Sequence, residues 1–414
     1  MDFNWLNLFL ILLLAWVLGL IVSRLGYPSV LGELAAGIIF GPPVMGVVHG
    51  DTGTAILGRI GVMMMLLFIG TQINPNDLVR AARVSLLPAV GGFLVPFALG
   101  YLATTQLFGG NFSAGLVVGT VMGTTSLATM SRVNVDLNLL RTHVGQMMTT
   151  IALFSVIIML VTFSVVMGVA LAGNIQLGAV ALILGKSLLF LVIMVGAGVY
   201  GFPLLGKLQA RLDVPDRTDD LTFALALTAL GALLAETLGL SYILGAFLVG
   251  LFLRPDMFEQ DIFGGILQAI RNVALGFLAP VFYVGAGFSV SFGVFVSNPT
   301  VVIAVVLLAL LGKFLGVFLF YWVEGRGWRE AMVIGSGMNA RGGVDIIAAG
   351  VALQAGIISK DVFTALICSI FLGTLSVPLA LKLGTDWLRR RGELIGVDDE
   401  PAPKLAPSAP QTTS

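Results

Sequence analysis

The chain has 414 residues, of which 57% are hydrophobic and only 11% are charged. Soluble globular proteins carry about 25% charged residues, so this composition excludes a large soluble domain and indicates a polytopic membrane protein. The formal net charge is zero, which argues against nucleic-acid binding, and the single cysteine, Cys368, excludes an internal disulfide and a cysteine-based metal site.

The apolar runs, divided at charges, prolines and Gly/Asn clusters, predict an all-α protein with about thirteen transmembrane helices. The first run lacks the basic region of a signal peptide, so we expect it to remain as a helix. Residues 1–385 are predicted to form the membrane domain, and the Pro/Ser-rich stretch 386–414 is predicted to be a disordered cytoplasmic tail. The predicted spans are 5–23, 28–48, 54–73, 84–107, 112–131, 143–172, 176–205, 219–238, 241–254, 266–290, 299–323, 330–355 and 361–384.

The distribution of lysine and arginine predicts the orientation. With the N-terminus outside, most of the 22 basic residues fall in loops on the cytoplasmic side or in the C-terminal tail, as the positive-inside rule requires. Arg59 and Lys360 lie near the outer face, whereas Lys186, Lys313 and Arg341 lie within spans. We therefore predict a multi-pass protein of the plasma (inner) membrane with its C-terminus in the cytoplasm.

The twelfth span contains the polar stretch "GSGMNARGGVDIIAAG", residues 335–350. Arg341 and Asp345 are four residues apart, so on a continuous helix they share one face and can pair. A structural salt bridge is therefore one interpretation. The glycines and Asn339 favour another, because they weaken the helix and free backbone groups, which a membrane tolerates only inside protein or beside a cavity. Lys313, halfway along its span, is a further candidate for function.

The fifth span has the same character. Its sequence "VVGTVMGTTSLATMSRV" places Thr124, Thr125 and Ser126 near the centre of an apolar run, after a glycine and a methionine. Two interrupted helices at matching places in the two halves of a chain are typical of transporters built on inverted repeats. Hydroxyl and carbonyl oxygens are also suitable ligands for an alkali cation. The sequence therefore predicts a transporter and not an enzyme, and no cofactor is expected.

Three other ionisable residues lie within spans. Glu33 is close to the start of its predicted helix, where the helix dipole stabilises a carboxylate, so a structural role is the simpler interpretation. Lys186 can reach an interface or a partner carboxylate, which also favours a structural role. Glu236 lies near a helix end, where snorkelling explains it as well as function does.

Six sequence blocks, in order, resemble the monovalent cation:proton antiporter-2 family, within the wider Na+/H+ exchanger fold. The resemblance implies a dimerisation domain and a mobile core whose two interrupted helices cross at mid-membrane. It also implies an elevator-type motion and a homodimer, with core helices that include residues 112–172 and 299–355. The blocks are "GYPSVLGELAAGIIFGP" (26–42), "LGRIGVMMMLLFIGTQIN" (57–74), "TSLATMSRVN" (125–134), "AETLGLSYILGAFLVGLFL" (235–253), "LAPVFYVGAGFSV" (278–290) and "MNARGGVDIIAAGVALQAGIIS" (338–359).

The same resemblance implies roles for individual residues. Lys313 matches the lysine that pairs with an aspartate in electrogenic members, and Asp345 matches the acid that follows "RG" on the second crossing helix. One departure stands out, because Ser155 and Val156 occupy the place of the family's ion-binding aspartate pair. Asp345 is then the acid left at the presumed centre, where Na+ or K+ would bind transiently.

Three interpretations follow from this departure. Proton and monovalent-cation exchange can depend on Asp345. Alternatively, Lys313 and Arg341 can serve an anion or neutral-solute transporter on the same fold. In the third interpretation, transport is lost and the protein is a sensor or scaffold. The expected partners are small inorganic ions and protons, the lipid bilayer and a second copy of the chain.

Overall fold

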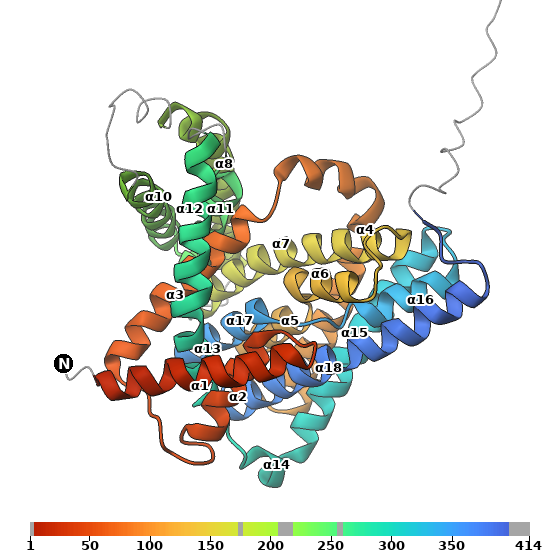
Figure 1. Cartoon of the computed structure of the whole chain (residues 1–414), viewed down its shortest axis with the longest axis horizontal. Coiled ribbons are helices and arrows are strands. Elements are labelled where there is room, and N and C mark those ends of the chain that lie inside the picture. The colour runs from red at the N-terminus through yellow and green to blue at the C-terminus, as the bar shows by residue number, and fades with distance from the viewer. Residues whose placement is uncertain (1–3, 173–176, 206–217, 255–259, 397–414) are drawn as a thin grey trace, which may run out of the picture.

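The computed structural model describes residues 4–172, 177–205, 218–254 and 260–396 (Figure 1). Regular structure in these ranges is helical, with one isolated antiparallel bridge between Thr142 and Gly396 and no strand. The prediction of an all-α protein is therefore confirmed.

The helices follow the predicted spans closely in the first half of the chain. The segment that begins at Pro75 ends in a π-helical turn, and the segment that begins at Leu177 contains one at residues 197–201 and continues as helix to Leu205. The elements are α1 (Trp5–Arg24), α2 (Ser29–Phe40), α3 (Thr52–Thr71), α4 (Pro75–Leu102) with η1 (Ala103–Leu107), α5 (Phe112–Met122), α6 (Leu127–Asp136), α7 (His143–Ala172), α8 (Leu177–Gly196) with η2 (Ala197–Gly201), α10 (Thr218–Thr237) and α11 (Tyr242–Phe252).

The second half contains the other interrupted segment. The elements are α12 (Gln260–Val273) with η4 (Ala274–Leu278), α13 (Ala279–Gly287), α14 (Val294–Ser297), α15 (Pro299–Val323), α16 (Trp328–Gly337), α17 (Gly343–Gln354) and α18 (Lys360–Arg390). Helix α18 continues to Arg390, past the predicted domain boundary at 385, and the division into a membrane domain and a tail stays a prediction. Most of that predicted tail, residues 397–414, lies outside the described residues.

Within the described ranges, nine helices are long and apolar enough to cross a bilayer. Shorter apolar helices cover Ser29–Phe40, Leu221–Thr237, Tyr242–Phe252 and Gly343–Gln354. The multi-pass prediction is confirmed, whereas the count of thirteen stays a prediction.

Both spans that the sequence identifies as interrupted are broken in the structure. The fifth predicted span divides into α5 and α6, separated by residues 123–126, and the twelfth divides into α16 and α17, separated by residues 338–342. Ser126 begins α6 as its N-cap, because its hydroxyl accepts a hydrogen bond from the backbone N–H of Thr129. The breaks therefore contain the polar residues that the sequence singles out.

The helices pack in two sets. The first, here called the crossing group, contains α4, α5, α6, α7, α15, α16 and α18, and the second, the flanking group, contains α1, α2, α3, α10, α11 and α13. In Figure 1, α15, α16 and α18 lie on the right-hand side, and α8, α10 and α11 gather at the upper left. Helix α17 contacts α5, α7 and α18 on one side and α13 on the other, so it lies where the two groups meet.

Candidate functional site

The two helix breaks meet in the interior of the protein. The backbone N–H of Ser126 donates to the carbonyl of Ala340 at 2.8 Å, and the Thr125 hydroxyl donates to the carbonyl of Met338 at 2.9 Å. All four residues are buried. A break leaves carbonyls without helical partners, and here the first break supplies donors for two carbonyls of the second. This bonding helps to explain how irregular backbone persists at this depth.

The carbonyl of Arg341 is satisfied in the same way. The hydroxyls of Thr129, on α6, and Thr374, on α18, each donate to it at 3.0 Å. Thr374 was not identified as a site residue from the sequence, because it lies in an otherwise unremarkable apolar run. Its contact fixes the second break against α18.

The Arg341 side chain is fully buried and bonds to backbone carbonyls. Its guanidinium donates to Val121 at 3.1 Å, to Met122 at 2.8 Å and more weakly to Ala309 at 3.4 Å. The first two carbonyls end α5, where the helix dipole is negative, so a cation is favourable there. Arg341 thereby joins the second break to the end of the first crossing helix.

Lys313 reaches the same helix end from α15. Its ammonium group donates to the carbonyl of Gly123 at 2.7 Å, and the side chain has no exposed surface. The amine of Lys313, from α15, and the guanidinium of Arg341, from the second break, thus converge on the carbonyls at the C-terminal end of α5. The partial negative charge of that helix end offsets part of the cost of burying them.

Asp345 lies in the first turn of α17 and is fully buried. Its Oδ2 atom accepts a hydrogen bond from the backbone N–H of Gly342 at 2.7 Å, in the manner of a capping box, and the helix N-terminus favours its negative charge. Its Oδ1 atom has no hydrogen-bond partner among the described residues. One carboxylate oxygen is therefore uncommitted.

The salt bridge between Arg341 and Asp345, one of the two interpretations of their spacing, is not present as a direct contact. Across the described ranges, no ion pair within 4.0 Å joins these two side chains. That interpretation needs one continuous helix, but α17 begins at Gly343, after Arg341. The guanidinium is consequently directed to the end of α5, and the carboxylate is left with a free oxygen.

The remaining predicted site residues are Thr124, Asn339 and Ser155, all of which are buried. The Thr124 hydroxyl donates weakly to the carbonyl of Thr120, at 3.3 Å, and also interacts with the Asp345 carboxylate. Asn339 donates to the carbonyl of Leu310 at 3.3 Å, while its Oδ1 atom has no partner in the described part of the chain. The buried hydroxyl of Ser155 on α7 is likewise without a partner there.

The oxygens of Asp345, Asn339 and Ser155 that have no partner among the described residues indicate which ions could bind here. Uncommitted oxygens of a carboxylate, an amide and a hydroxyl are hard ligands, which suit an alkali cation or a proton better than a transition metal. Within the described residues, no cluster of three or more His, Cys, Asp or Glu side chains could hold a metal ion permanently. Asp345 is therefore the candidate position for a small cation, whereas the side chains of Lys313 and Arg341 are bonded to carbonyls.

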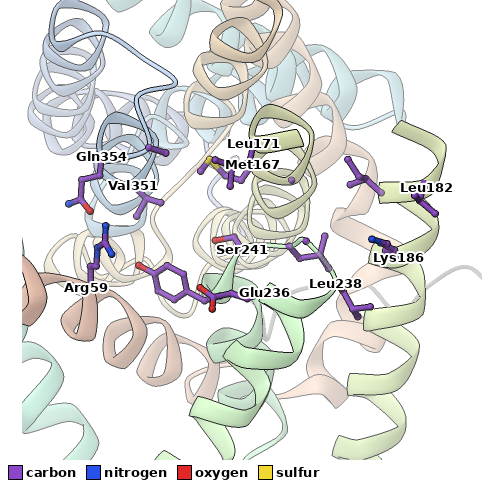
Figure 2. Close-up of a pocket in the computed structure, with 16 residues that line it drawn as sticks. Arg59, Met167, Leu171, Leu182, Lys186, Glu236, Leu238, Ser241, Val351 and Gln354 are labelled. Carbon is purple, nitrogen blue, oxygen red and sulfur yellow. The ribbon is translucent and has the colours of Figure 1, made fainter. Parts of the chain in front are cut away.

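A separate cavity of about 610 Å³ lies between α3, α7, α8, α17 and the α10–α11 connection. Figure 2 shows Arg59 and Gln354 on one side of it, Glu236 and Ser241 near the middle, and Lys186 on the opposite side. Arg59, Lys186 and Glu236 are thus brought together around one cavity. A lysine and a glutamate within membrane helices are less costly where water can reach them.

Comparison with known proteins finds sodium/hydrogen exchangers and related antiporters. The family model described as the transmembrane sodium/hydrogen exchanger matches residues 9–383. The chain is 27% identical over 373 residues to the Na(+)/H(+)-K(+) antiporter GerN of Bacillus cereus, covering 90% of this chain and 94% of that protein. It is also 27% identical over 400 residues to the Na(+)/H(+) antiporter NhaS4 of Synechocystis, covering 91% of this chain and 96% of that protein.

A solved structure shares the fold. The sodium proton antiporter MjNhaP1 from Methanocaldococcus jannaschii, at pH 8, superposes with a TM-score of 0.67 and 20% sequence identity. The alignment covers 92% of this chain and 95% of that one. The predicted exchanger-type fold and the family resemblance are therefore confirmed.

Proposed function

Because this chain belongs to the transmembrane sodium/hydrogen exchanger family, we propose that it exchanges a monovalent cation, Na+ or K+, for protons. The observation that supports this most directly is the carboxylate of Asp345. It is fully buried at the junction of two broken helices and keeps one oxygen uncommitted.

A single carboxylate of this kind is sufficient for exchange. It can hold a proton or an alkali cation, and each neutralises the same negative charge, so binding of one displaces the other. Arg341 and Lys313 are both occupied by carbonyls at the end of α5, which leaves Asp345 free to change partners. Ser155 supplies a hydroxyl where the family has an acid, so this carboxylate acts alone.

The two helix groups suggest how the site is exposed to either side of the membrane. The first break is bonded to α15, and the second break, which precedes Asp345, is bonded to α5, α15 and α18, which favours their movement as one body. We propose an elevator-type motion of this group, including residues 112–172 and 299–355, against the flanking group. The flanking group would form the homodimer, with the N-terminus outside and the C-terminus in the cytoplasm of a plasma (inner) membrane.

The test is cation-driven proton movement in proteoliposomes that contain the purified protein. Na+ or K+ should collapse an imposed pH gradient, and Asp345→Asn should abolish this response. Asp361→Asn is the matched control, because Asp361 lies in the first turn of α18 at a helix end. If neither these cations nor Li+ dissipates the gradient, the proposal is wrong.

A second candidate function is supported by the two buried cations. If the cargo is an anion or a neutral solute, Lys313→Ala and Arg341→Ala should abolish uptake, while Asp345→Asn should have a mild effect. The geometry favours this less, because both cations already bind carbonyls. A non-transporting sensor or scaffold would keep its cellular phenotype after all three substitutions.

A further inference from the structure

Two consecutive glycines, Gly342 and Gly343, at the start of α17 allow side chains of two other helices to approach its backbone closely. A Cβ atom built on Gly342 would lie 2.5 Å from Oγ of Ser126, in the first helix break. A Cβ atom built on Gly343 would lie 2.1 Å from the hydroxyl oxygen of Tyr283, on α13. The start of α17 is therefore held between the first crossing helix and a helix of the flanking group.

Tyr283 is well placed to act on this turn. It is 6% exposed, and its ring packs edge-on against Phe282, with ring centroids 5.4 Å apart. Phe282 in turn lies close to Gly350, farther along α17, where an added Cβ would be 3.2 Å from its ring. The two aromatic rings of α13 thus follow α17, and this packing fixes the position of the Tyr283 hydroxyl.

The same hydroxyl lies within electrostatic range of two carboxylates. One is Asp345, in the turn that Tyr283 contacts, and the other is Glu33, which is buried on α2 of the flanking group. A phenolic oxygen is a hard, neutral ligand with lone pairs to offer, and Asp345 has an oxygen free to share a cation with it. The hydroxyls of Thr125 and Thr129, beside the helix breaks, already donate to carbonyls. Tyr283, on α13 of the flanking group, brings a further oxygen close to the same turn.

We propose that the Tyr283 hydroxyl is a ligand, contributed by the flanking group, for the cation carried at Asp345. This inference rests on the proposed cation exchange. The position also predicts that cation affinity differs between the two sides of the membrane. The break that precedes Asp345 is bonded to the crossing group through Arg341, whereas Tyr283 lies on α13 of the flanking group. Movement of one group against the other separates the two residues, so the ligand is present when the site faces one side of the membrane and absent when it faces the other.

The experiment compares the two faces of the membrane. Tyr283→Phe is reconstituted in proteoliposomes of known orientation, and the KM for Na+ and for K+ is measured from each side. We expect KM to rise about tenfold from one side only, because one hydrogen-bonding or ligating group contributes roughly that factor. Tyr101→Phe is the control, because Tyr101 packs against Phe112 at 5.9 Å, away from the start of α17.

The outcomes separate this inference from the function on which it rests. If the unmodified protein exchanges cations for protons and Tyr283→Phe has unchanged or symmetrically altered KM values, the ligand assignment is overturned and the exchange stands. If the unmodified protein shows no cation-dependent flux, both are overturned. Thermal unfolding without cation checks that Tyr283→Phe is folded. Because the substitution removes only the hydroxyl, the melting temperature should stay close to that of the unmodified protein.

Discussion

The ammonium nitrogen of Lys313 lies 2.7 Å from the carbonyl oxygen of Gly123, so a buried lysine on α15 binds the broken end of α5 and not a carboxylate. Its charge is fully desolvated and is compensated by a helix end and one hydrogen bond. Such a residue contributes less to stability than an apolar side chain of similar size. Its presence is therefore better explained by transport than by folding.

This gives the first prediction, for Lys313→Met. We expect the apparent melting temperature in detergent to stay the same or to rise by a few degrees, because the buried charge is removed. Cation-driven flux should fall by about tenfold or more, because the break at Gly123 loses its partner. Lys186→Met, beside the cavity of Figure 2, is the control and should keep its flux. A large loss of stability in Lys313→Met would show that the lysine is structural.

Ser155 allows a second prediction. Its buried hydroxyl has no partner among the described residues, so Ser155→Ala should change the free energy of unfolding by less than about 0.5 kcal/mol. If the hydroxyl binds the cargo during transport, the KM for the cation should nevertheless rise. Flux and thermal unfolding of the same preparation measure both effects.

Ser164, on the same helix, is the matched control for that experiment. Its hydroxyl accepts a hydrogen bond of 3.1 Å from the backbone N–H of Ser241, at the start of α11. Ser164→Ala leaves that donor unpaired and should cost about 1–3 kcal/mol. Equal losses of unfolding free energy in Ser155→Ala and Ser164→Ala would contradict the conclusion that only the Ser164 hydroxyl is hydrogen-bonded to another helix.

The sequence predicts the broken helices well, because clusters of glycine and hydroxyl residues within long apolar runs weaken a helix at that point. It also predicts that the two breaks belong together. It does not predict the contacts of Arg341, since a spacing of four residues implies a shared face only where the helix is continuous. Thr374 and Tyr283 are missed because they lie in ordinary apolar segments, and only the packing of distant helices brings them to the second break.

Asp51 provides a third prediction, at the N-terminus of α3. Its carboxylate accepts hydrogen bonds from the backbone N–H of Thr54, at 2.7 Å, and from the amide of Asn7, at 3.5 Å. Partial burial acts to raise the pKa of Asp51, but these hydrogen bonds outweigh it and hold the pKa below its usual value. A lowered pKa in the folded state means that the carboxylate contributes stability above its unfolded pKa of about 4 and loses it as the pH falls further.

We therefore expect Asp51→Ala to destabilise the protein by about 1 kcal/mol at neutral pH. The difference from the unmodified protein should shrink as the pH falls below about 4, because the native carboxylate is then protonated. Thr54→Val is the comparison, since it removes the hydroxyl that accepts a hydrogen bond from the Asp51 backbone N–H, without removing a charge. Because this hydroxyl is only one of several groups that lower the pKa of Asp51, the cost of Thr54→Val should vary less with pH than that of Asp51→Ala. A pH-independent cost for Asp51→Ala would contradict the prediction.

The contact between Gly343 and Tyr283 gives the last prediction, which does not depend on transport. Gly343→Ala places a Cβ 2.1 Å from the Tyr283 hydroxyl oxygen, whereas the next ring atom, Cζ, is 3.1 Å away. Removing the hydroxyl therefore removes most of the clash.

We expect Gly343→Ala to lower the apparent melting temperature and the double variant with Tyr283→Phe to recover part of the loss, with a coupling of about 1–3 kcal/mol. Gly350→Ala on the same helix should be milder, because its nearest neighbour, Phe282, is 3.2 Å from the added Cβ. If the double variant melts at a lower temperature than Gly343→Ala alone, the Tyr283 hydroxyl does not contact the start of α17.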